Sequence, residues 1–128
     1  MLRPSPEWNT VCGALSSPTR LDGRYLVEGV MGAANWSEVL QKASKHGAEA
    51  DVVARLLTSF GISVTDVTRE DAQGAADLWR ARSTLSLADR LCLALGLRLG
   101  EEVVTLHAAW LEVPAGPSVR LINRDTLR

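Results

Sequence analysis

The feature that most constrains the fold is an alternation of strand-like and helix-like segments that starts at Gly29. Residues 48–60 carry apolar side chains at helical spacing and stop at Gly61, a common residue at helix ends. Residues 62–67 then alternate between apolar and polar side chains, as a strand does. Strands separated by helices predict a mostly parallel sheet with helices on both faces, which is an α/β fold.

Three patterns mark helix starts, because each places a polar N-cap residue three positions before an acidic residue. The pairs are Asn35 with Glu38, Thr68 with Asp71, and Ser86 with Asp89. They predict one helix after the apolar run 29–34, one that reaches Arg82, and one over 90–99 that ends at Gly100. Shorter elements are expected after these helices: a strand at 102–106, a turn or helix at 107–112, and a strand at 118–122.

Residues 1–28 do not follow this order. Pro4, Pro6 and Pro18 interrupt each candidate element, because proline cannot donate a hydrogen bond in a central strand. The length of 128 residues suits one compact domain. We therefore expect a divergent N-terminal segment at 1–24 and one domain at 25–128.

The composition excludes several classes of protein. A formal net charge of −1 leaves no strong electrostatic attraction for nucleic acid or membranes, so any RNA contact requires a local patch. Cys12 and Cys92 have no CxxC spacing, which argues against a zinc site and for a reducing compartment. The apolar runs are too short to span a bilayer. A cytoplasmic protein with no membrane contact is expected.

Three stretches, 34–40, 85–95 and 103–110, carry a resemblance to a known family. From Tyr25 to the C-terminus the chain resembles the PIN-domain family, in particular the VapC-type toxin ribonucleases of type II toxin–antitoxin systems. The resemblance implies a three-layer αβα fold around a central, mostly parallel sheet. It also implies hydrolysis of RNA phosphodiester bonds with Mg²⁺ or Mn²⁺ held by carboxylates, a homodimer, and a cognate antitoxin protein as partner.

The resemblance assigns roles to five residues. Glu38 and Asp89 match two acidic positions and are expected to be catalytic metal ligands, because hard divalent ions prefer oxygen ligands. His107 stands where the family usually has an aspartate, and is a candidate metal ligand as a neutral imidazole. Thr105 is expected to orient a ligand or a water, and Ser86 to support Asp89.

The chain departs from the family at its N-terminus. Members begin with a strand that ends in an acidic residue, and no such segment precedes Tyr25, so the first strand of the sheet is expected to be irregular or missing. A change of reading frame and a true lineage-specific replacement both explain this departure.

Each functional interpretation has an alternative. Capping alone would explain Glu38 and Asp89, and exposed helix faces alone would explain Arg80, Arg82 and Arg90, which otherwise suit RNA phosphates. For the whole chain, the alternative is a catalytically inactive PIN domain that binds protein or RNA, because two carboxylates leave few fixed contacts for a metal ion.

Overall fold

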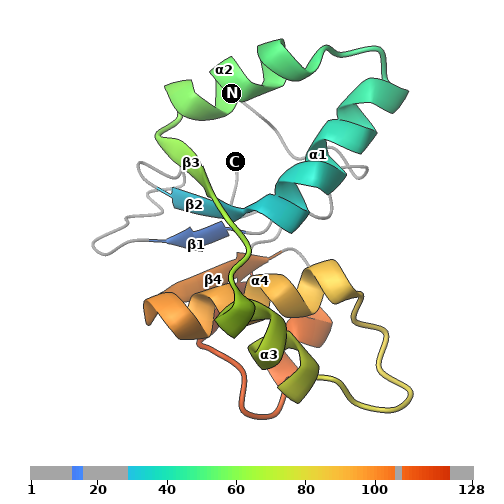
Figure 1. Ribbon diagram of the computed structural model, residues 1–128, viewed down its shortest axis with the longest axis vertical. Coiled ribbons are helices and arrows are strands. Elements are labelled where there is room, and N and C mark those ends of the chain that lie inside the picture. The colour runs from blue at the N-terminus through green and yellow to red at the C-terminus, as the bar shows by residue number, and fades with distance from the viewer. Residues whose placement is uncertain (1–12, 16–28, 106–107, 122–128) are drawn as a thin grey trace.

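The structure is a computed structural model that describes residues 13–15, 29–105 and 108–121 (Figure 1). The described strands form one five-stranded sheet in the order β3-β2-β1-β4-β5. These strands are β1 (Gly13–Leu15), β2 (Gly29–Gly32), β3 (Ile62–Thr65), β4 (Glu102–Thr105) and β5 (Val119–Leu121). The helices are α1 (Ala33–Lys45), α2 (Ala50–Ser59), α3 (Arg69–Asp77), α4 (Leu87–Leu99) and the 3₁₀ helix η2 (Ala108–Glu112). None of the described helices has the length and apolar character needed to cross a bilayer.

The central strand β1 runs against its neighbours. Ala14 lies opposite Val30 of β2 and Val103 of β4, and both pairings are antiparallel. The pairings of β2 with β3 and of β4 with β5 are parallel. Four of the five strands therefore run in one direction, and the predicted α/β fold with a mostly parallel sheet is confirmed. The first strand is present but irregular, since it has three residues and the opposite direction.

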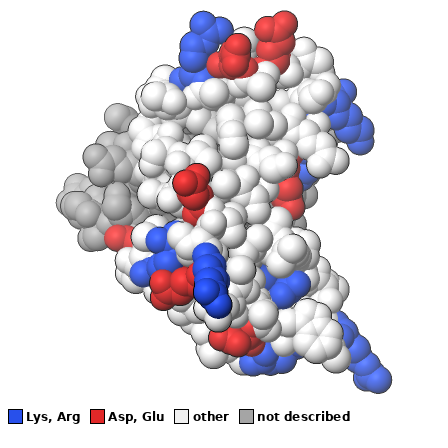
Figure 2. Space-filling model, viewed as in Figure 1, with Lys and Arg blue, Asp and Glu red and all other residues white. Residues whose placement is uncertain are grey.

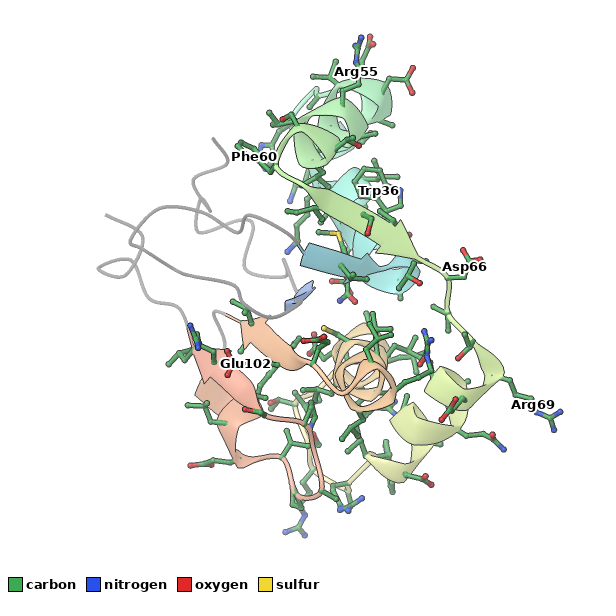
Figure 3. All side chains as sticks on the ribbon, turned by 90° about the vertical axis from the view of Figure 1, so that its left-hand side faces the viewer. Trp36, Arg55, Phe60, Asp66, Arg69 and Glu102 are labelled. Carbon is green, nitrogen blue, oxygen red and sulfur yellow. The ribbon has the colours of Figure 1, made fainter. Side chains whose placement is uncertain are left out.

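The apolar core has two parts. The core beside β2 consists of Met31, Val39, Ala43, Val53 and Leu57. The core beside β4 consists of Leu78, Cys92, Leu93, Val103 and Trp110. Figure 1 shows the corresponding arrangement, with α1 and α2 on the β2–β3 side of the sheet and α3 and α4 on the β4 side. The connection from β3 to α3 links the two groups of helices. Asp66 in this connection and Arg69 at the start of α3 point outward (Figure 3).

The start of α1 differs from the sequence-based expectation. Its N-cap is Gly32, which is also the last residue of β2, so the strand runs into the helix without a linker. Asn35 lies in the first turn of the helix, is fully buried and makes no capping hydrogen bond. The prediction of a capping box between Asn35 and Glu38 is therefore wrong, because a tertiary contact takes the Asn35 side chain.

The other two capping boxes are confirmed. Thr68 and Asp71 cap α3, and Ser86 and Asp89 cap α4, each with both reciprocal hydrogen bonds. Gly100 ends α4 with φ +65°, as expected of a residue in the left-handed region.

Helix α3 is shorter than predicted, since it ends at Asp77 and not at Arg82. The Arg80 side chain donates to the main-chain oxygens of Asp77 and Trp79, at 2.7 and 2.8 Å, which satisfies carbonyls at the helix end. Arg82 has φ +65°, a conformation that does not continue a right-handed helix.

A partly buried ion pair joins α3 to the last turn of α4. Arg98 Nε lies 2.6 Å from Asp71 Oδ1, and Arg98 Nη2 lies 3.1 Å from Oδ2. Burial of the Asp71 carboxyl acts to raise its pKa, but the hydrogen bonds from Arg98 and from the Thr68 amide, together with the Arg98 charge, lower it below its ordinary value of 3.8. The pair therefore stabilises the α3–α4 contact while Asp71 is ionised.

Replacing the Asp71 carboxylate by a neutral amide, Asp71→Asn, is expected to lower the free energy of unfolding by about 1.5 kcal/mol, because the partly exposed Arg98 then lacks its charged partner. Since the folded-state pKa is depressed, the difference from wild type is fully present above pH 3.8 and shrinks as the pH falls through the lower folded-state value. Urea unfolding across that pH range measures it. The exposed Asp77→Asn on the same helix is the control, and an equal effect of both variants would contradict this account.

Candidate functional site

Two helix N-termini meet beside the edge of the sheet where β2 ends. Helix α1 starts directly after β2, and Asn35 Nδ2 in its first turn donates to the main-chain oxygen of Ala88 in the first turn of α4, at 3.4 Å. Both β2 and β4 pair antiparallel with β1, so they run in the same direction and β4 also ends at this edge. The start of α1, the start of α4 and the end of β4 therefore surround one place in the fold.

Glu38 in α1 and Asp89 in α4 lie near enough to each other there for the charge of Asp89 to act on Glu38. Burial raises the pKa of the Glu38 carboxyl, the negative charge of Asp89 raises it further, and Lys42 one turn along α1 acts against both. Glu38 Oε2 is buried and has no hydrogen-bond partner among the described residues. Since the cap of α1 is Gly32, capping does not explain this buried carboxylate.

Asp89 is held in place by the capping box of α4. Its Oδ2 accepts from the Ser86 amide at 3.0 Å, and its own amide donates to Ser86 Oγ at the same distance. Capping alone is therefore enough to explain Asp89, as the structural alternative holds. The same bonds fix its carboxylate at the start of α4, where its charge acts on Glu38.

The other expected site residues fall into two groups. Thr105 is the last residue of β4, at the same edge, and only 2% of its surface is exposed. His107, the candidate ligand in place of an aspartate, lies outside the described residues. Within the described ranges, no three His, Cys, Asp or Glu side chains gather closely enough to hold a metal ion.

The donor set fits one hard divalent cation. A buried carboxylate oxygen without a partner, next to a second carboxylate, is electrostatically unfavourable alone and favourable beside a cation. Mg²⁺ is commonly bound through one or two carboxylates and keeps several waters. Glu38 and Asp89 are therefore of the chemical type that could hold one such ion.

The direction of β1 bears on the position where the family is expected to have its first carboxylate. Gly13 lies opposite Val104, and Leu15 lies opposite Glu102, at the start of β4. The chain therefore leaves β1 at the end of the sheet away from the candidate site. A strand of the opposite direction in this place would instead end at the same edge as β2 and β4.

The three arginines considered for RNA contact have different surroundings. Arg90 Nη1 donates to the main-chain oxygen of Ala75 at 2.8 Å and ties α4 to α3, so its role is structural. Arg80 and Arg82 are exposed. Figure 2 shows acidic and basic side chains mixed over the visible face, with a narrowing between the two groups of helices and no continuous basic stripe.

The fold and this acidic edge define an α/β domain with a carboxylate pair at the end of its parallel strands. A family model described as the PIN domain matches residues 13–115, and the chain therefore belongs to the PIN domain family. PIN domains are generally nucleases that act on RNA and typically depend on a divalent metal. No curated protein and no solved structure matches the chain.

The family match also bears on the start of the domain. It begins at residue 13, inside the segment 1–24 that the sequence sets apart, and it includes β1. The division of the chain into 1–24 and 25–128 stays a prediction.

The partly buried charge of Glu38 is expected to lower the free energy of unfolding of the metal-free protein. In the metal-free protein, Glu38→Gln is expected to raise the free energy of unfolding near neutral pH by about 0.5 kcal/mol, because a neutral amide carries no charge to bury and is not repelled by Asp89, while solvent screens part of both effects. The folded-state pKa of Glu38 is raised, so the gain fades as the pH falls through that value and wild-type Glu38 becomes neutral.

Thermal unfolding in the presence of a chelator, at pH 7 and at pH 4, measures this gain. The exposed Glu112→Gln in η2 is the matched control. A Glu38→Gln variant less stable than wild type at pH 7 would contradict the assignment of an unfavourable carboxylate pair.

Proposed function

We propose that this PIN domain is an endoribonuclease of the VapC toxin type, which hydrolyses RNA phosphodiester bonds with Mg²⁺ or Mn²⁺ held by Glu38 and Asp89. The observation that carries the proposal is the buried Glu38 oxygen, which lacks a partner among the described residues although the charge of Asp89 acts on the same carboxyl group. Membership of a family of metal-dependent nucleases supports the same chemistry.

The residues divide the work as follows. Glu38 and Asp89 bind the ion through oxygen, and Ser86 keeps Asp89 oriented through the two capping hydrogen bonds. When bound, the ion would lower the pKa of a coordinated water, and its positive charge would stabilise the phosphate that is attacked. Thr105 orients a ligand or a water through its hydroxyl, and His107 stays a candidate for a further ligand.

The proposal includes the partners that the resemblance implies. RNA is the substrate, a small antitoxin protein is the inhibitor, and two copies of the chain form a homodimer in the cytoplasm. The support for these finer points is the likeness of segments 85–95 and 103–110 to VapC-type toxins. Exposed Arg80 and Arg82 suit phosphate contacts, because each carries a full positive charge outside the core.

A second candidate function is a catalytically inactive PIN domain that binds RNA or protein. The observation in its favour is that the described residues contain no cluster of three metal-ligating side chains. Two carboxylates hold a divalent ion weakly, and a weakly held ion gives little catalysis. Both candidates use the same fold and differ in metal affinity.

Cleavage of a mixed RNA substrate in Mn²⁺ tests the proposal. Wild type is expected to cut the RNA. The rate is expected to fall by about a hundredfold or more in Glu38→Gln and in Asp89→Asn, because each variant removes an anionic ligand. Asp77→Asn is the control for loss of one carboxylate, because Asp77 is exposed and lies in α3, which carries neither candidate ligand. Equal cleavage by wild type and both site variants would contradict the assignment of Glu38 and Asp89 as metal ligands.

Titration with Mn²⁺ separates the two candidate functions. A folded wild-type protein that binds no Mn²⁺ and cuts no RNA is the inactive module. A wild-type protein that binds Mn²⁺ and cuts RNA, and loses both properties in each site variant, is the nuclease.

A further inference from the structure

Asn35 is a buried polar side chain whose presence needs an explanation. None of its surface is exposed, although asparagine is mostly a surface residue. Its Nδ2 donates to the Ala88 oxygen at 3.4 Å, and its Oδ1 has no partner among the described residues. Burial of an amide costs free energy when its hydrogen bonds are incomplete, so an apolar residue would stabilise the fold better here.

The surroundings of the amide are closely packed. A Cβ atom at Gly32 would lie 3.3 Å from Asn35 Oδ1 and 3.4 Å from Leu95 Cδ2. The amide therefore fills the space between the end of β2 and helix α4. Gly32 leaves room for it, and also serves as the N-cap of α1 without any help from the Asn35 side chain.

The one hydrogen bond of this amide joins the two turns that carry the candidate ligands. Asn35 lies three positions before Glu38, on the same side of α1, and its acceptor Ala88 directly precedes Asp89. Without a tether, two neighbouring carboxylates would move apart, because like charges repel. A bond between the two helix starts opposes that movement.

We infer that Asn35 is a positioning residue, which ties the first turn of α4 to the first turn of α1 and so sets the separation of Glu38 and Asp89. This inference rests on the proposed function, since the separation matters only for a metal held between the two carboxylates. Asn35 itself is not a ligand in this account.

Two variants remove the tether. Asn35→Leu has a similar volume and no donor, and Asn35→Ser keeps a polar group too short to reach Ala88, so it carries the test if the leucine variant does not fold. Two properties are measured on the full chain: hydrogen exchange of the Arg90 amide, which bonds to the Ser86 oxygen in the first turn of α4, and the Kd for Mn²⁺ from the paramagnetic resonance of the free ion.

We expect exchange at Arg90 to become about fivefold faster in both variants, as the loss of one hydrogen bond implies. The Kd for Mn²⁺ should rise by about tenfold or more, as is typical when a residue that orients a metal ligand is removed. Arg98→Gln, which breaks the contact at the other end of α4, is the control. It should lower the melting temperature and leave the Kd unchanged.

The outcomes separate this inference from the proposed function. Wild type that binds no Mn²⁺ would overturn the proposed metal site. Unchanged exchange in both variants would overturn the tether, whatever the metal does. Faster exchange with an unchanged Kd would overturn the positioning role, because Asn35 would then only hold the helices together.

Discussion

The structure depends on the hydrogen bonding of β2 and β4 to one short strand between them. Because β1 is antiparallel to both, β2 and β4 point the same way and end at one edge of the sheet. Helix α1 begins at that edge, and its contact with α4 brings Glu38 to Asp89. The same reversal takes the exit of β1 away from the edge.

Unfavourable polar burial is concentrated where α1 and α4 begin. Within the described ranges, three buried side-chain atoms lack a hydrogen-bond partner: Asn35 Oδ1, Glu38 Oε2 and Arg90 Nε. All three lie in or near the first turns of these two helices. A fold selected for stability alone would replace them, whereas a site for a charged ligand needs unsatisfied polar groups before the ligand binds. The gathering of these unsatisfied buried polar atoms at two helix starts is the strongest structural argument for a functional site.

The sequence predicted correctly those helix ends that local interactions determine. The starts of α3 and α4 follow from capping boxes, and the ends of α2 and α4 follow from Gly61 and Gly100, which have positive φ. The start of α1 was predicted wrongly, because Asn35 is used in a contact with α4 that no local pattern reveals.

The direction of β1 also lay beyond the sequence, since a strand of three residues is defined by its partners and not by its own alternation. The proximity of Glu38 and Asp89 was expected only from resemblance, because 50 residues lie between them in the chain.

The most direct test of the proposed metal site is the broadening of amide resonances by substoichiometric Mn²⁺. We expect broadening centred on the first turns of α1 and α4, with the last turns of these two 13-residue helices much less affected. Broadening centred elsewhere, for example around Asp66 and Glu70, would contradict it.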